Sequence, residues 1–249
     1  MMHYKPSVGC ILEETNYKLD KYRNPETLNI FCDGSYLGKR QVGGFAAVGV
    51  VGEQIIEITR RGWSQQGKFS NDLMEIYAFK EALSMAFMYK DIYPSINIFS
   101  DSSYVIHAIK TWIYKWHFDN NNQVYIKNNK YPANIHYIYE LATTVIQLMM
   151  CIPNFNLFYT KGHLNSMGDL PTLIEAKLTF CRENDLPDQD IDLNFIRYMS
   201  RYNDAADKQA RIGANNHRFN CNMTDAIEFN LQNINKVAKS IVVSNIKYT

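Results

Sequence analysis

Four acidic residues, each near the beginning or end of an expected strand or helix, are the part of this sequence that could do chemistry. They come from four separate segments and are Asp33, Glu75, Asp101 and Asp207. Carboxylates gathered from distant segments repel one another, so a fold keeps them together only if bound cations offset that repulsion. The four residues are therefore a candidate two-metal site for phosphodiester chemistry.

Two of these acids directly follow apolar runs that predict β-strands. Asp33 closes the first run, and Asp101 closes the fourth. The strands are expected at about 28–33, 44–51, 54–61, 95–100 and 154–160. Glycine turns and close spacing predict an antiparallel meander for the first three strands. The last two follow helical crossovers and are expected to be parallel.

The segments between the strands have the residue spacing of helices. Ser70 can cap a helix that contains Glu75 and runs to about Lys90. Further helices are expected at about 102–116 and 134–150. The order of strands and helices predicts an α/β fold with a five-stranded mixed sheet.

A long segment, residues 164–202, separates the last strand from the region that contains Asp207. It holds amphipathic stretches around 172–180 and 193–202. Apolar residues over 227–241 recur at spacings of three and four, which predicts a C-terminal amphipathic helix.

The composition limits the partners and the compartment. Hydrophobic residues make up 46% of the 249 residues and charged residues 20%, which is typical of a globular protein with a full core. The 26 Lys and Arg nearly balance the 25 Asp and Glu, so nucleic-acid binding must come from local patches and bound metal ions. The five cysteines form no C-x-x-C pair, which argues against a zinc module or a disulfide framework. Neither a signal peptide nor an apolar membrane span is evident, so we expect a soluble, cytoplasmic protein that does not bind membranes.

Five motifs surround or lie between the acids. They are Asp33-Gly34-Ser35-Tyr36-Leu37-Gly38 after the first strand, Asn71-Asp72-Leu73-Met74-Glu75 on the first helix, Ser100-Asp101-Ser102-Ser103-Tyr104-Val105 after the fourth strand, Lys161-Gly162-His163 in a loop, and Asn203-x-x-Ala206-Asp207-x-x-Ala210 on the last helix. They occur in the order found in type 1 ribonuclease H, a family that the chain resembles over about residues 28–211. Each motif alone is weak, but five in this order are specific.

The resemblance implies a ribonuclease H-like fold, with helices on both faces of the sheet, and an enzyme that cuts the RNA strand of RNA–DNA hybrids. The products would carry 5′-phosphate and 3′-hydroxyl ends. It also implies two Mg²⁺ ions, with Mn²⁺ as a possible substitute, and no small-molecule cofactor. Asp33 would bridge both ions, and Glu75, Asp101 and Asp207 would complete the ligand set. His163 would move a proton or assist product release.

The resemblance also implies a set of substrate contacts, because hydroxyl and amide groups can read the 2′-hydroxyls that mark an RNA strand. The candidates are Ser35, Tyr36, Ser70, Asn71, Ser103, Trp112, Trp116 and Asn134. Ser70 and Asn71 could hold a DNA phosphate at the start of their helix. For Trp112 and Trp116, packing in the core and a substrate platform are equally open interpretations.

The resemblance divides the chain into three parts. They are an N-terminal extension over 1–27, a catalytic domain over 28–211 with an insertion at about 164–202, and a C-terminal helical extension over 212–249. Within the last catalytic helix, Asp204 is interpreted as a helix N-terminal acid rather than a ligand.

The chain departs from the family pattern at the groove. Asp72 stands where the family commonly has a second asparagine, and the substrate handle, 117–130, is rich in asparagine with only Lys127 and Lys130 as basic residues. With few basic residues to contact phosphates, the handle is expected to bind the hybrid weakly, or other parts of the chain must supply the missing contacts. Two alternatives therefore stay open: a binding module of the same fold with little turnover, or a different nuclease of that fold, such as a resolvase or a DNA-strand transferase.

Overall fold

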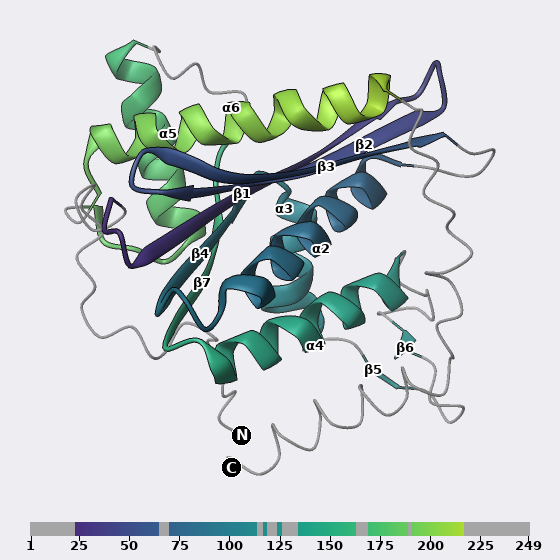
Figure 1. The fold of residues 1–249 in the computed structure, drawn as a ribbon, viewed down its shortest axis with the longest axis horizontal. Coiled ribbons are helices and arrows are strands. Elements are labelled where there is room, and N and C mark those ends of the chain that lie inside the picture. The colour runs from purple at the N-terminus through teal and green to yellow at the C-terminus, as the bar shows by residue number, and fades with distance from the viewer. Residues whose placement is uncertain are drawn as a thin grey trace.

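Five strands form one mixed sheet in the structure, which is a computed structural model (Figure 1). The residues that it describes are 23–64, 70–113, 117–118, 124–125, 134–162, 169–188 and 191–216. The strands are β1 (Thr27–Leu37), β2 (Val42–Val51), β3 (Gln54–Ser64), β4 (Ser95–Ser100) and β7 (Asn154–Tyr159), in the spatial order β3-β2-β1-β4-β7. The first three are antiparallel, and β4 and β7 run parallel to β1. The α/β fold and its mixed sheet, expected from the sequence, are confirmed.

Helices cover both faces of this sheet (Figure 1). On one face lie α2 (Asn71–Tyr89) and α4 (Ile135–Cys151), and on the other lie α5 (Leu170–Glu183) and α6 (Leu193–Asn215). The smaller elements are α3 (Ser103–His107), the π-helical turn η1 (Ala108–Trp112), and a separate two-stranded sheet of β5 (His117–Phe118) and β6 (Val124–Tyr125).

The central strand β1 is buried on both faces. Leu28 and Ile30 belong to the core beneath α2, whereas Phe31 belongs to the core beneath α5 and α6. Phe31 stacks on Phe99 of β4 with ring centroids 4.7 Å apart. Alternate side chains of a strand point to opposite faces, so consecutive apolar residues supply two cores at once.

A row of three asparagines crosses the sheet on the face of α6. Asn29, Asn97 and Asn156 occupy paired positions on β1, β4 and β7. Asn97 Nδ2 donates to Asn29 Oδ1 at 2.9 Å, and Asn156 Nδ2 donates to Asn97 Oδ1 at 3.0 Å. Asn29 Nδ2 donates to the Tyr198 hydroxyl of α6, which in turn donates to the Gly52 carbonyl. The row ties three parallel strands to α6.

The helix expected at 102–116 is divided in the structure. Ser102 caps α3 by accepting from the Val105 N–H, as a helix start requires. After five residues the hydrogen bonding widens into the π-helical turn η1. Residues 114–116 lie outside the described part of the chain, so the expected end of this helix stays a prediction.

The last helix begins earlier than expected. α6 runs without a break, so the amphipathic stretch at 193–202 is its first half, and the expected boundary at 212 falls inside it. Its cap is Asp192, whose Oδ1 accepts from the Phe195 N–H at 2.6 Å. Asp204 therefore lies in the middle of a helix, and its interpretation as an N-terminal acid is wrong.

The two ends of the chain, residues 1–22 and 217–249, lie outside the described residues, and so does the expected C-terminal helix. Among the helices that the structure describes, none combines the length and the apolar character needed to cross a membrane.

Candidate active site

The site is built where the parallel pairing of β1 with β4 ends. β4 stops there, whereas β1 continues through Asp33 to Leu37 beside β2. Cys32 of β1 is paired with Ser100 of β4. Asp33 directly follows Cys32 in the sequence, and Asp101 directly follows Ser100. Ligands of α/β proteins bind where the carboxyl ends of parallel strands meet. The sheet register therefore brings the first two predicted acids side by side.

The third acid is brought to these two by the close approach of α2 to β1. A Cβ atom at Gly34 would overlap the backbone of Met74 and Glu75, so only glycine permits this approach. The Gly34 N–H donates to Glu75 Oε2 at 3.2 Å, and Asn71 Nδ2 donates to Glu75 Oε1 at 3.3 Å. Two donors thus hold the Glu75 carboxylate in place.

Asp33, Glu75 and Asp101 each offer an oxygen atom within 4.8 Å of the other two. Burial, followed by the charges of Asp101 and Asp207, raises the pKa of Asp33 to about 8. Burial, followed by the charges of Asp33 and Asp101, raises the pKa of Glu75 as well. The crowded carboxylates would be stabilised in their charged form by a cation, and an all-oxygen ligand set suits a hard ion such as Mg²⁺.

The fourth acid, Asp207, approaches from α6. It lines the same cleft as the other three, which has a volume of about 740 Å³, and its charge is one of those that raise the pKa of Asp33. Its Oδ1 accepts from Arg211 Nε at 2.7 Å, one helical turn later. Asp207 thus borders the other three acids and has the Arg211 guanidinium beside it.

Asp101 is held from two sides by residues that were named only as parts of motifs. Asn203 Nδ2 donates to Asp101 Oδ2 at 3.2 Å, while the buried Asn203 Oδ1 has no hydrogen-bond partner among the described residues. On the other side, a Cβ atom at Gly162 would overlap that same carboxylate. The orphaned Asn203 oxygen is placed to accept from a water molecule beside Asp101, which fits a hydrated metal ion.

The signal for Asn203 was present in the sequence. It precedes Asp207 by one helical turn, and residues four apart lie on the same face of a helix. A polar residue on the face of a candidate ligand is well placed to orient the ligand set.

Half of the predicted substrate contacts line this cleft, namely Ser35, Tyr36, Asn71 and Ser103. Asn71 also donates to Glu75, so it supports a candidate ligand as well as facing the cleft. Ser70 instead caps α2 by accepting from the Leu73 N–H at 3.2 Å.

Two further predicted contacts, Trp112 and Asn134, interact with Tyr104, and Tyr104 lines the cleft. The Trp112 side chain is 38% exposed, and its ring packs edge-on against that of Tyr104 with centroids 5.7 Å apart. Asn134 precedes α4 with a φ of 56° and hydrogen-bonds Tyr104. Trp112 of η1 therefore packs partly against α3, while its remaining surface is available to a substrate.

His163 and Trp116 lie outside the described residues, as does most of the handle at 117–130. Sequence reasoning also missed cleft residues that bear charge or a hydroxyl group. They are Ser102, Tyr104, Tyr159, Lys161 and Arg211. Asp72, which stands where the family commonly has an asparagine, also lines the cleft.

A family model described as RNase H matches residues 25–170 of the chain. This range contains Asp33, Glu75 and Asp101, and it ends where α5 begins.

Curated proteins with similar sequences carry the same description. A ribonuclease H of Helicobacter pylori is 35% identical over 100 residues, covering 40% of this chain and 64% of the relative. The ribonuclease H of Helicobacter acinonychis is 37% identical over 94 residues, covering 36% and 58%. The chain thus spans less than two thirds of the length of these relatives.

Solved structures with a similar arrangement have low sequence identity. A ribonuclease H1 from Halobacterium salinarum has a TM-score of 0.38 at 15% identity, covering 53% of this chain and 84% of that one. A prototype foamy virus protease–reverse transcriptase has a TM-score of 0.45 at 17% identity, covering 75% and 20%. These scores are low, and no conclusion rests on them.

Proposed function

The chain belongs to the RNase H family, and on this premise we propose that it is a metal-dependent endoribonuclease that hydrolyses the RNA strand of RNA–DNA hybrids. One observation carries the proposal. Asp33, Glu75 and Asp101, taken from three separate elements, present oxygen atoms within 4.8 Å of one another. No packing requirement explains three buried or half-buried carboxylates so close together, whereas metal-ion catalysis of phosphodiester hydrolysis uses such a set.

The acids would hold two Mg²⁺ ions, for which Mn²⁺ could substitute. When bound, such ions supply an activated water molecule and stabilise the leaving 3′-oxygen, so that the products carry 5′-phosphate and 3′-hydroxyl ends. Gly34 and Asn71 keep Glu75 turned toward Asp33 by donating to its carboxylate. Asn203 does the same for Asp101.

Recognition of the hybrid would use the polar groups along the cleft. Ser35 and Tyr36 at the end of β1 and Asn71 at the start of α2 line it. Their hydroxyl and amide groups can donate to a 2′-hydroxyl and accept from it, which a DNA strand cannot reciprocate. The role of His163 in proton transfer or product release remains part of the proposal.

A cleavage assay on a labelled RNA–DNA hybrid tests this function directly. The wild type should cut the RNA strand only with Mg²⁺ or Mn²⁺, and Asp33→Asn and Asp101→Asn should not cut it. If both variants cut as fast as the wild type, the assigned site is wrong.

The same assay separates the alternatives when double-stranded RNA and branched DNA are included. Tight hybrid binding without metal-dependent cleavage would indicate a binding module. Cleavage of branched DNA in preference to the hybrid would indicate a different nuclease of this fold. The complete acidic set favours hydrolysis, because a module that only binds has no need for clustered carboxylates.

A further inference from the structure

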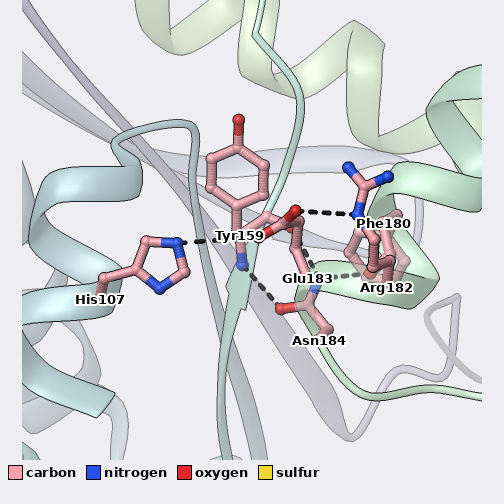
Figure 2. Close-up of polar contacts among 6 residues, drawn as sticks. All are labelled: His107, Tyr159, Phe180, Arg182, Glu183 and Asn184. Atoms are coloured by element: carbon pink, nitrogen blue, oxygen red, sulfur yellow. Dashed lines mark hydrogen bonds and ion pairs between the residues drawn. The ribbon is translucent and has the colours of Figure 1, made fainter. Parts of the chain in front are cut away.

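The side chain of Asn184, at the end of α5, pairs with the backbone of β7. The Tyr159 N–H donates to Asn184 Oδ1 at 2.9 Å, and Asn184 Nδ2 donates back to the Tyr159 carbonyl at 2.8 Å (Figure 2). Among the described residues, β7 is the last strand of the sheet and has no strand beside it on this edge. The amide therefore supplies the two hydrogen bonds that a sixth strand would make there.

Only the amide groups of asparagine and glutamine place a donor and an acceptor on two atoms side by side, as this pairing uses them. Asn184 is 8% exposed, and its Nδ2 also donates to the Phe180 carbonyl at 2.9 Å. Its own N–H donates to the same carbonyl and closes the end of α5. Every polar group of the side chain is thus satisfied, and the side chain is fixed between the helix and the strand.

The same end of α5 contacts α3. Glu183 Oε2 lies 3.7 Å from Nε2 of His107, the last residue of α3 (Figure 2). Earlier in α5, Glu175 Oε1 lies 2.6 Å from Lys161 Nζ. α3 begins two residues after Asp101, and Lys161 lies two residues after Tyr159. α5 therefore contacts both segments that border Asp101.

The segment held by Asn184 leads directly to the Asp101 carboxylate. After Tyr159, the Thr160 N–H donates to the Ser100 carbonyl at 2.9 Å, which extends the pairing of β7 with β4. Two residues later, Gly162 lies so close to Asp101 that a Cβ atom there would overlap the carboxylate. The position of this backbone therefore limits the orientations open to Asp101.

We propose that Asn184 is a positioning residue for Asp101. It fixes the end of β7, and thereby the Gly162 backbone against which the Asp101 carboxylate lies. α5 starts where the family match ends, so this support is a property of the segment inserted before α6. The inference rests on the proposed function to the extent that Asp101 is a metal ligand there.

The test measures Mn²⁺ binding to the full chain by calorimetry and, separately, the hybrid cleavage rate over a metal titration. Asn184→Leu keeps the size of the side chain and removes its hydrogen bonds. Outer contacts that orient metal ligands typically change affinity or activity by 10–100-fold, so we expect Mn²⁺ to bind about tenfold more weakly. The metal concentration for half-maximal cleavage should rise in parallel.

Two further variants separate positioning from general stability. Asp169→Ala removes the cap at the other end of α5, where Asp169 Oδ1 accepts from the Thr172 N–H. It should lower the melting temperature. Its Mn²⁺ affinity should stay within about twofold of the wild-type value, because Asp169 does not contact the metal ligands. Asn184→Asp keeps an acceptor for the Tyr159 N–H but turns an oxygen toward the Tyr159 and Phe180 carbonyls, so it should also weaken Mn²⁺ binding.

Each outcome decides the matter. The inference is overturned if Asn184→Leu and Asn184→Asp both bind Mn²⁺ as tightly as the wild type. It is also overturned if Asn184→Leu does not fold and Asn184→Asp binds as tightly as the wild type, or if the wild type binds no Mn²⁺. Equal weakening by Asp169→Ala would also overturn it, because the effect would then be one of stability alone. A wild type that binds Mn²⁺ but cuts no hybrid would refute the proposed function, while the binding data would still decide the role of Asn184.

Discussion

Arg211 Nε lies 2.7 Å from Asp207 Oδ1 on α6, so the fourth acid of the site already has a positive partner. The Arg211 side chain is 56% exposed, and the two residues are one helical turn apart. Exposed pairs of this kind contribute about 0.3–0.5 kcal/mol. The arginine is therefore a weak competitor for a carboxylate that a metal ion would also use.

Arg211→Met should accordingly strengthen metal binding. Loss of the ion pair with Asp207 should lower the Mg²⁺ concentration for half-maximal cleavage by about twofold. Arg201→Met, on the same helix beside Tyr202, is a matched control that should leave that concentration unchanged. Weaker metal binding in Arg211→Met would show instead that the arginine holds Asp207 in its working position.

Asn203→Asp should impair the site by placing a fifth carboxylate beside Asp101. The substitution exchanges the Nδ2 donor for an oxygen that repels Asp101 Oδ2, at present 3.2 Å away. We expect the cleavage rate at saturating Mg²⁺ to fall by about 10–100-fold, as for other residues that orient metal ligands. Asn194→Asp, on the exposed side of the same helix, is the control. Equal rates for both variants would contradict the role of Asn203.

Gly34→Ala should destabilise the protein and displace Glu75. The new methyl group would overlap the backbone of α2, and overpacking of this kind costs about 1–3 kcal/mol. Urea unfolding measures this loss. Gly38→Ala is the control, because the nearest atom to a Cβ there is Tyr36 Cε1 at 3.6 Å. A Gly34→Ala protein as stable as the wild type would mean that α2 can move away from β1.

The stability of the metal-free protein should fall as the pH rises. The pKa of Asp33 is raised from 3.8 to about 8, so the folded chain binds a proton that the unfolded chain has already lost. The Asp33 contribution is therefore favourable at low pH and is lost progressively between about pH 4 and pH 8.

Melting curves in a chelator measure this effect as the difference between wild type and Asp33→Asn. The variant should gain melting temperature relative to the wild type as the pH rises, and Mg²⁺ should reduce that gain. A difference that does not change with pH would contradict the raised pKa of Asp33.

The sheet and three of the acids could be predicted because their signals are local. Asp33 and Asp101 each end an apolar run, and runs that lie parallel and adjacent bring their ends together. Glu75 follows a capped helix start on the helix that packs against β1. For these residues the sequence neighbourhood contains the information that the fold uses.

The beginning of α6 was missed because the residues that face the sheet change in size along it. Tyr198 and Tyr202 bury large rings in the first half, whereas Ala206 and Ala210 are the buried residues of the second half. Rings pack over β1, and small side chains let the backbone approach β2. Because the buried residues change from large to small, the sequence pattern of this one helix is interpreted as two separate segments.

The pairing of Asn184 with Tyr159 could not be predicted for a different reason. An asparagine that follows a helix is ordinarily interpreted as its cap, and Asn184 does close α5. Its second role depends on the position of β7 at the edge of the described sheet, which follows only from the order of the strands.

The asparagine row across the sheet has a consequence for how the site is assembled. Asn29 and Asn97 lie four residues before Asp33 and Asp101 on adjacent strands. If one strand slipped by a residue during folding, amide groups would be buried without partners, at a cost of about 1–3 kcal/mol for each group. Hydrogen bonds in the interior of the sheet thus disfavour any strand alignment other than the one that places the two carboxylates side by side.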